Sequence, residues 1–245
     1  LDALLELLVA RQPRYAARWL SVTFDDGYAD SAAYIASRAA RFPDVEFTFF
    51  VCPGKLEART GFRWDLAEEA MKAGRPRDEA IAGTDVAVEL ERENAREELK
   101  ALSKHPDYAL ASVEEVNALL KFPNVRLGNH TNLHVSAMRT PDDVVRGDYS
   151  TSKAQFERLF GPMAQFAFPY GTPVHHFGPR HVEMLRALGQ FEIWTTEARP
   201  YRLEERRPGA VLPRFPVNGG RTARELAGWI AARCLDFRVR GRKLA

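Results

Sequence analysis

Two adjacent carboxylates stand at the end of a β-prone run near the start of the chain. Residues 22–24 favour a strand, Asp25 and Asp26 follow, and Gly27 permits a sharp turn. In parallel α/β proteins, the carboxyl ends of strands are where functional sites are built. Two acids at such an end can bind a metal ion or act as a base. Taken alone, they are also ordinary turn and helix-capping residues.

Two histidines follow a second short apolar run. Residues 125–127 favour a strand, and the segment GNHTNLH after it contains His130 and His134. Two imidazoles and one carboxylate form a ligand set for zinc and related ions that leaves positions open for water and substrate. A lone HxxxH also arises from unrelated surface histidines. Combined with DDG at another strand end, it indicates a catalytic metal site.

A third strand end carries Pro169, Tyr170 and Gly171, after the apolar run at 165–168. Pro-Tyr-Gly is typical of a rigid turn. Alternatively, the backbone N–H of Tyr170 faces the same cavity and donates a hydrogen bond to a developing oxyanion.

The elements around these motifs alternate between strand and helix. A strand beginning near Trp19, a helix at 31–41 and a strand at 46–51 form one βαβ unit, which predicts a parallel sheet with right-handed crossovers. Ser112 and Glu115 have the spacing of a capping box at the start of a helix over 112–120. Further helices are predicted at 1–9 and 141–160. The fold class is therefore α/β.

A long charged segment separates the second and third strands. It includes helix-forming runs at 65–72 and 85–102, and the latter has many acid–base pairs at i, i+4 and a thin apolar stripe. We interpret residues 55–110 as a helical insertion that covers the barrel or forms one wall of a substrate groove.

Composition excludes some classes of function. The 245 residues include 35 Lys+Arg and 33 Asp+Glu, a net charge of +2, so we expect no nucleic-acid partner. Cys52 and Cys234 form no CxxC motif. No apolar run approaches the ~20 residues of a transmembrane helix, and no signal peptide is visible. Because the chain begins with Leu1, the compartment is left open: soluble and cytoplasmic, or exported with the leader absent.

Together the motifs resemble the polysaccharide deacetylase family, also called the NodB-homology family or carbohydrate esterase family 4. The resemblance rests on TFDDG at 23–27, TFFV at 48–51, GNHTNLH at 128–134 and FAFPYG at 166–171, and spans about 19–217. It implies one domain over 1–245, a distorted (β/α) barrel of about seven parallel strands with the helical insertion.

The resemblance also implies a function. A divalent ion, zinc in first place, is expected on Asp26, His130 and His134, with Asp25 as the general base and the Tyr170 amide at the oxyanion. The implied reaction is metal-dependent removal of N-acetyl groups from amino sugars of a polysaccharide or glycoconjugate. An acetylated glycan is therefore the expected partner.

The chain departs from the family pattern at two positions. Ala167 stands where the family carries an arginine that orients the base, and we expect Arg214, in LPRFPV at another strand end, to replace it rather than to be an ordinary surface arginine. The family also has a histidine near the C-terminus as general acid, but none follows His181 here. Either a histidine at 175–176 supplies the proton, or Asp25 returns it.

The predicted substrate contacts are Pro169, Trp194 and His175. Trp194, in FEIWTTE, is interpreted as a groove wall, with barrel core as an equal alternative. Competing functions are an O-deacetylase, a hydrolase of a non-sugar amide, and a non-catalytic carbohydrate-binding descendant of the fold. A phosphatase with an aspartyl nucleophile is disfavoured, because its two acids are separated by one residue, whereas Asp25 and Asp26 are adjacent.

Overall fold

A single parallel sheet organises the chain. The computed structural model describes residues 1–10, 20–76, 93–189, 191–217 and 220–241. In these residues the sheet has six strands in the order β1-β2-β3-β4-β5-β6, each parallel to its neighbour. The strands are β1 (Leu20–Phe24), β2 (Val45–Val51), β3 (Val125–Asn129), β4 (Gln165–Ala167), β5 (Glu192–Trp194) and β6 (Val211–Leu212). The sheet curls into a half-barrel, so the predicted class holds, although the described part has six strands rather than about seven.

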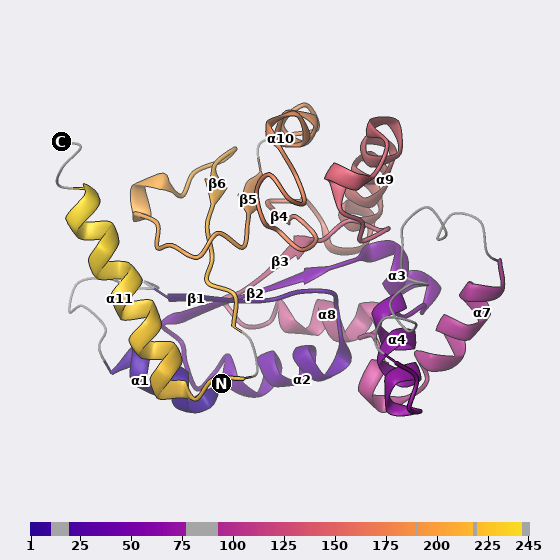
Figure 1. Ribbon diagram of the computed structural model, residues 1–245, viewed down its shortest axis with the longest axis horizontal. Coiled ribbons are helices and arrows are strands. Elements are labelled where there is room, and N and C mark those ends of the chain that lie inside the picture. The colour runs from indigo at the N-terminus through magenta and orange to yellow at the C-terminus, as the bar shows by residue number, and fades with distance from the viewer. Residues whose placement is uncertain (11–19, 77–92, 190, 218–219, 242–245) are drawn as a thin grey trace.

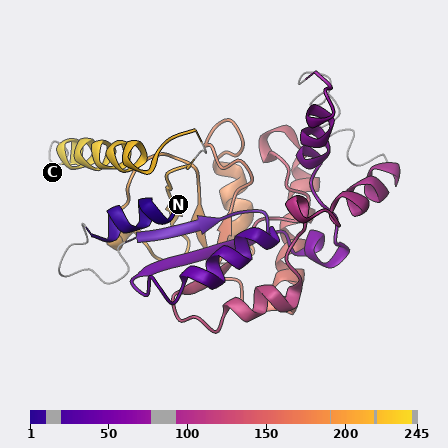
Figure 2. The same ribbon diagram turned by 90° about the horizontal axis from the view of Figure 1, so that it is seen from below.

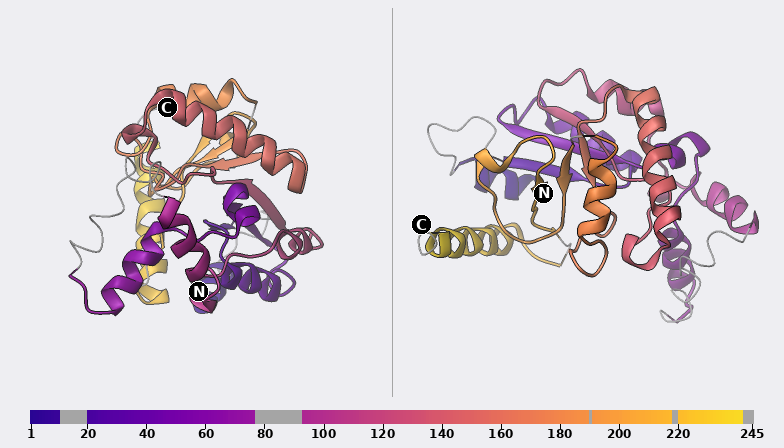
Figure 3. Two further views of the ribbon diagram at one scale, coloured as in Figure 1. Left: turned by 90° about the vertical axis from the view of Figure 1, so that its right-hand side faces the viewer. Right: turned by 90° about the horizontal axis from the view of Figure 1, so that it is seen from above.

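Helices surround this sheet. They are α1 (Asp2–Val9), α2 (Ala29–Arg38), α3 (Pro53–Ala58), α4 (Arg63–Lys72), α7 (Glu93–Leu102), α8 (Val113–Leu119), α9 (Asp142–Phe160), α10 (Pro179–Arg186) and α11 (Ala223–Gly241). In Figure 1, α2 and α8 lie below the sheet, and α9 and α10 lie above it. Seen from above, α9 and α10 lie side by side, with α11 apart from them (Figure 3). No helix in the described ranges is long and apolar enough to cross a bilayer.

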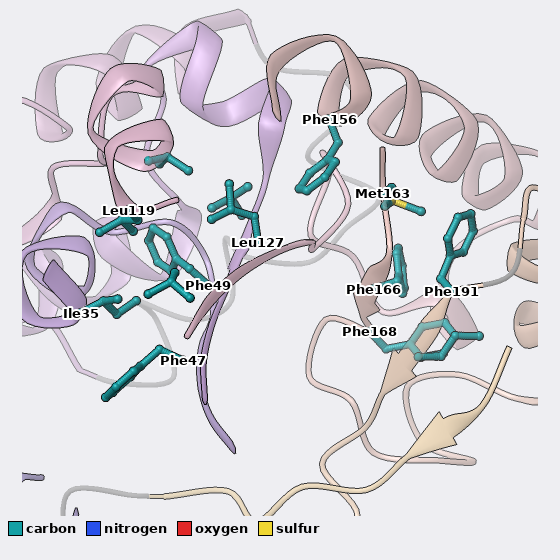
Figure 4. Packing of buried hydrophobic residues seen from close by; sticks show 14 of the residues in the cluster. Ile35, Phe47, Phe49, Leu119, Leu127, Phe156, Met163, Phe166, Phe168 and Phe191 are labelled. Atoms are coloured by element: carbon teal, nitrogen blue, oxygen red, sulfur yellow. The ribbon is translucent and has the colours of Figure 1, made fainter. Parts of the chain in front are cut away.

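Strand β2 shows how the sheet is buried on both faces. All seven of its residues are buried, as expected for a central parallel strand. Successive side chains point to opposite faces. Phe47 and Phe49 pack toward the helices, where Phe49 lies beside Ile35 and Leu119 (Figure 4). Phe50 points the other way and packs in a separate cluster with Ala167, Trp194 and Leu212, which come from β4, β5 and β6.

The close packing of β3 against β2 depends on a glycine. A Cβ atom on Gly128 would lie 2.3 Å from ring carbons of Phe50. The sheet therefore accommodates the Phe50 ring only where β3 has no side chain.

Several helices agree with the sequence prediction. The capping box of α8 is confirmed, because the Glu115 amide donates to Ser112 Oγ at 3.1 Å and the Ser112 amide donates to Glu115 Oε2 at 2.7 Å. The helix predicted at 65–72 is α4, and the 93–102 part of the second predicted insertion helix is α7. The remainder of that prediction, 85–92, lies outside the described residues.

Three helices, α3, α10 and α11, are not indicated by the sequence patterns. Helix α11 packs its Leu226 and Ala227 against Leu4 and Leu8 of α1, so segments far apart in the sequence are held together. Helices α3, α4 and α7 lie at the end of the sheet toward which β1 and β2 point (Figures 1 and 2). The segment between β2 and β3, which we call the β2–β3 excursion and which includes the predicted helical insertion, thus approaches the strand ends that carry the sequence motifs.

Candidate active site

The three predicted metal ligands converge at the carboxyl ends of β1 and β3. One ligand atom from each of Asp26, His130 and His134 lies within 4.8 Å of the other two. Asp26 Oδ1 is 3.0 Å from His134 Nε2 and 3.6 Å from His130 Nε2. The parallel sheet therefore brings the Asp26 carboxylate to one point with two imidazoles that lie more than 100 residues later in the sequence.

The protonation of His130 suits a metal ligand. Its Nδ1 lies 2.8 Å from the carbonyl oxygen of Ala167, so Nδ1 carries the hydrogen and Nε2 presents its lone pair to the carboxylates. Burial lowers the pKa of the His130 imidazole below its ordinary value, which favours the neutral ring that a metal ion requires. Asp26 Oδ1 is buried and has no hydrogen-bond donor among the described residues. These features fit a divalent cation such as zinc.

Helix α9 holds the loop that carries the two histidines. The buried Asp148 carboxylate accepts hydrogen bonds from the amides of Asn132 at 3.0 Å and Leu133 at 3.3 Å. The His134 amide donates to Thr131 Oγ1 at 3.0 Å. Burial raises the pKa of Asp148 to about 6, although the two amides act in the opposite direction. Asp148 is therefore positioned to fix the backbone between the two imidazoles.

The site contains an unusual concentration of left-handed backbone. Asp26, Thr131, His134 and Tyr170 have φ values of 76°, 67°, 52° and 61°. Non-glycine residues rarely adopt this conformation, and such strain gathers at functional sites where the surrounding structure imposes it.

Asp25 is held by Arg214, which follows β6. Arg214 Nη1 donates to Asp25 Oδ1 at 2.7 Å and Nη2 donates to Oδ2 at 2.6 Å, a bidentate pair. Nη1 also donates to Thr23 Oγ1 at 2.9 Å. Burial would raise the pKa of Asp25, but the charge and hydrogen bonds of the Arg214 guanidinium act in the opposite direction, and the pKa lies below its ordinary value. Asp25 is thus kept as a carboxylate beside the three ligands, with Oδ2 3.8 Å from His130 Nε2.

Tyr170 borders the same site. Its ring centroid lies 5.1 Å from that of His134, and the residue is 49% exposed. Its carbonyl oxygen accepts a hydrogen bond from Thr196 Oγ1 at 2.9 Å. The proposed role of the Tyr170 amide at an oxyanion stays a prediction.

The predicted substrate contacts need correction. Trp194 is 1% exposed and packs with Phe50 and Leu212, so it belongs to the barrel core and forms no groove wall. Pro169 is also buried, which removes its side chain from contact with a substrate. His175 is exposed, and the ring of its neighbour His176 lies 5.2 Å from that of Tyr170.

Sequence reasoning missed two aromatic residues beside the site. Trp64, in the first turn of α4, has its ring centroid 4.6 Å from that of His134, and Phe62 lies 5.5 Å from the same imidazole. The signal was present, because GFRW is an aromatic run inside an otherwise charged insertion. No strand-end pattern pointed to it.

The structure is thus an α/β half-barrel with a carboxylate and two histidines at its strand ends, beside an arginine-paired aspartate. The family model for polysaccharide deacetylase matches residues 13–190 of this chain. The chain belongs to the polysaccharide deacetylase family. No curated protein sequence matches it.

Solved structures share the fold at low sequence identity. IcaB from Ammonifex degensii is 19% identical to this chain, with a TM-score of 0.54, and the match covers 93% of this chain and 87% of the IcaB chain. The Streptococcus pyogenes deacetylase PplD, solved in complex with acetate, is 12% identical, with a TM-score of 0.56, and the match covers 94% of this chain and 77% of the PplD chain. A de-N-acetylase from Aggregatibacter actinomycetemcomitans is 12% identical, with a TM-score of 0.57, and the match covers 94% of this chain and 81% of the de-N-acetylase chain.

Proposed function

We propose that this protein is a metal-dependent hydrolase that removes N-acetyl groups from the amino sugars of a polysaccharide or glycoconjugate. The observation that carries the proposal is the bidentate Arg214–Asp25 pair beside Asp26, His130 and His134. Membership of the polysaccharide deacetylase family and the likeness to a de-N-acetylase support the choice of reaction.

Asp26, His130 and His134 would hold the ion, with zinc the preferred candidate for two imidazoles and one carboxylate. A divalent ion bound there would polarise the acetyl carbonyl and make a neighbouring water molecule more acidic. Asp25 has a different task. Because Arg214 keeps it ionised and oriented, it accepts the proton from the attacking water.

The remaining steps use the same groups. Water adds to the acetamide carbonyl carbon, and the Tyr170 amide donates to the oxygen that gains negative charge. The C–N bond then breaks and the amine nitrogen takes a proton, which leaves acetate and a free amino sugar. Asp25 holds the proton taken from water and returns it to the nitrogen. This route needs no separate general acid, and the chain has no histidine after His181 to act as one.

Acetate release tests the proposal. Zinc-loaded protein is incubated with N-acetylglucosamine oligomers and with acetylated glycolipids, and free acetate is measured. We expect Asp25→Asn to lower the rate by about 10²- to 10⁴-fold, the usual contribution of a general base. Asp44→Asn, an exposed aspartate before β2, is the matched control. The proposal fails if no acetylated glycan yields acetate, or if Asp25→Asn and Asp44→Asn behave alike.

O-deacetylation is a second candidate, and one observation favours it. An alcohol leaving group needs less protonation than an amine, so the absence of a histidine after His181 would matter less for an ester. Comparing O-acetylated with N-acetylated sugars of the same chain length distinguishes the two. A higher kcat/KM on the ester would replace the leading proposal.

A further inference from the structure

An aromatic surface from the β2–β3 excursion stands next to the metal-ligand candidates. Phe62 and Trp64 stack with ring centroids 4.2 Å apart and planes inclined by 12°. Phe62 is buried, whereas Trp64 is only half-buried. Phe62 covers one face of the indole, and the Trp64 side chain as a whole still keeps part of its surface exposed.

Hydrogen bonds fix the orientation of this indole. Trp64 Nε1 donates to the Tyr28 hydroxyl at 2.8 Å, and that hydroxyl donates to Asp65 Oδ1 at 2.6 Å. The other oxygen of the buried Asp65 accepts the Phe62 amide at 2.8 Å, which caps the start of α4. Tyr28 lies two residues after Asp26, so the network joins the excursion to the loop that follows β1.

This arrangement differs from simple core packing. A tryptophan that only fills space is stabilised by complete burial, but here a rigidly held indole keeps part of its surface exposed, with its ring centroid 4.6 Å from that of His134. Tyr170 adds a second exposed ring, 5.1 Å from the same imidazole. Preorganised aromatic surface beside catalytic groups is typical of a ligand-binding site. It is also the aromatic surface that the buried Trp194 does not provide.

We infer that Trp64, together with Tyr170, binds the apolar face of a sugar ring in a glycan chain and thereby selects oligosaccharides over small acetyl compounds. The inference rests on the proposed function and assigns the substrate contact to the excursion. The C–H face of a pyranose ring buries apolar area against an aromatic face, while its hydroxyl groups remain hydrated. Little conformational entropy of the Trp64 side chain is lost on binding, because its hydrogen bond to the Tyr28 hydroxyl already fixes the ring.

The test compares Trp64→Ala and Trp64→Phe with Trp229→Ala. Trp229 is the matched control, since it is also half-buried and also contacts an aromatic ring, that of Phe215, but it belongs to α11. Each variant is assayed with N-acetylglucosamine oligomers and with 4-nitrophenyl acetate, which has no sugar ring. Calorimetric titration of the oligomers, in the Asp25→Asn background, measures binding without hydrolysis. Bound zinc and Tm are recorded for every variant.

For Trp64→Ala we expect KM for the oligomers to rise about tenfold more than KM for the aryl acetate, with a matching loss of oligomer affinity in the titration. The ratio of the oligomer KM to the aryl acetate KM in Trp64→Phe should lie between the ratios of Trp64→Ala and the unaltered protein. Trp229→Ala should change neither this ratio nor the oligomer affinity. Equal losses on both substrates accompanied by loss of zinc would overturn the inference, because Trp64 would then only support His134. Unchanged oligomer affinity would also overturn it. If the unaltered protein binds oligomers through Trp64 but releases no acetate, the proposed function fails and the contact stands.

Discussion

Among the described residues, the carboxylate of Asp25 has one charged partner at hydrogen-bonding distance, and that partner is distant in the sequence. Arg214 is 11% exposed at its side chain and also lies over the Phe50 ring, with the guanidinium carbon 5.3 Å from the ring centroid. Its planar fork satisfies both carboxylate oxygens at once, which a lysine ammonium does not do.

Replacing Arg214 by lysine tests this partnership. We expect Arg214→Lys to lower kcat for acetate release by about 10- to 100-fold, the effect of losing one charge-assisted hydrogen bond worth about 1.5–3 kcal/mol. Zinc content should not change, because Arg214 is not among the ligand candidates. Arg186→Lys, at an exposed arginine paired with Glu183, is the control. An unaltered kcat in Arg214→Lys would remove Arg214 from the mechanism.

Asp148 supports the ligand candidates in a different way, through the backbone of the loop that carries the two histidines. In Asp148→Ala the amides of Asn132 and Leu133 lose their acceptor. We expect zinc affinity to fall about 10- to 100-fold, as is usual when a group that orients metal ligands is removed. Competition with a chromogenic chelator measures it. Asp143→Ala removes an exposed carboxylate from the first turn of the same helix and should leave the affinity unchanged. Equal affinities in the two variants would contradict this role.

At the scale of elements, the approach of β3 to β2 makes Gly128 intolerant of a side chain. We expect Gly128→Ala to destabilise the protein by about 1–3 kcal/mol, because the new methyl group would overlap the Phe50 ring. Gly147 is the control: it lies inside α9, and a Cβ atom added there would meet open space. Gly147→Ala should stabilise the protein by up to about 1 kcal/mol through helix propensity. Urea denaturation of both variants measures the difference, and equal effects would refute the packing argument.

Sequence patterns locate the strands well because apolar β-prone runs end in turn residues. They fail where an element is too short to show a period. Strand β5 spans only Glu192–Trp194, and three residues do not reveal which side chain faces inward, so groove wall and barrel core were equal alternatives for Trp194. Its burial confirms the core and excludes the groove wall. Helix α4 is predictable from its own residues, but nothing local indicates that Trp64 in its first turn meets His134.

For the molecule as a whole, the candidate metal centre joins separate parts of the sheet. Asp26 follows β1 and both histidines follow β3, so an ion bound to all three would stabilise the folded state and not the unfolded chain. The convergence of the DDG and HxxxH motifs was predictable, since parallel strands place their carboxyl ends at one edge. The choice of Asp26 rather than Asp25 as the ligand candidate came from the family resemblance. The Arg214–Asp25 contact, at a separation of 189 residues, was also predicted, because LPRFPV stands at another strand end, and the bidentate pair confirms it.

Metal removal tests this linkage. Zinc at 100 times its dissociation constant should stabilise the protein by about 2.7 kcal/mol. For a chain of this size, that corresponds to a rise in Tm of about 5–10 °C over chelator-treated protein. Acetate release should disappear with chelator and return with zinc. His130→Ala should abolish the thermal shift, whereas His105→Ala, at an exposed histidine that is not one of the ligand candidates, should retain it. A shift that survives His130→Ala would place the ion elsewhere.

The position of Arg214 has a consequence for synthesis of the chain. The family model ends at residue 190, and Arg214 follows it. A ribosome therefore delivers Asp25, the ligand candidates and Tyr170 well before the guanidinium that holds Asp25 in place. A nascent chain that ends before Arg214 contains all three ligand candidates but not the guanidinium that pairs with Asp25. Under the proposed mechanism, a product that terminates before Arg214 would keep the three ligand candidates but lack the group that orients Asp25, so we expect it to turn over substrate more slowly than the complete chain.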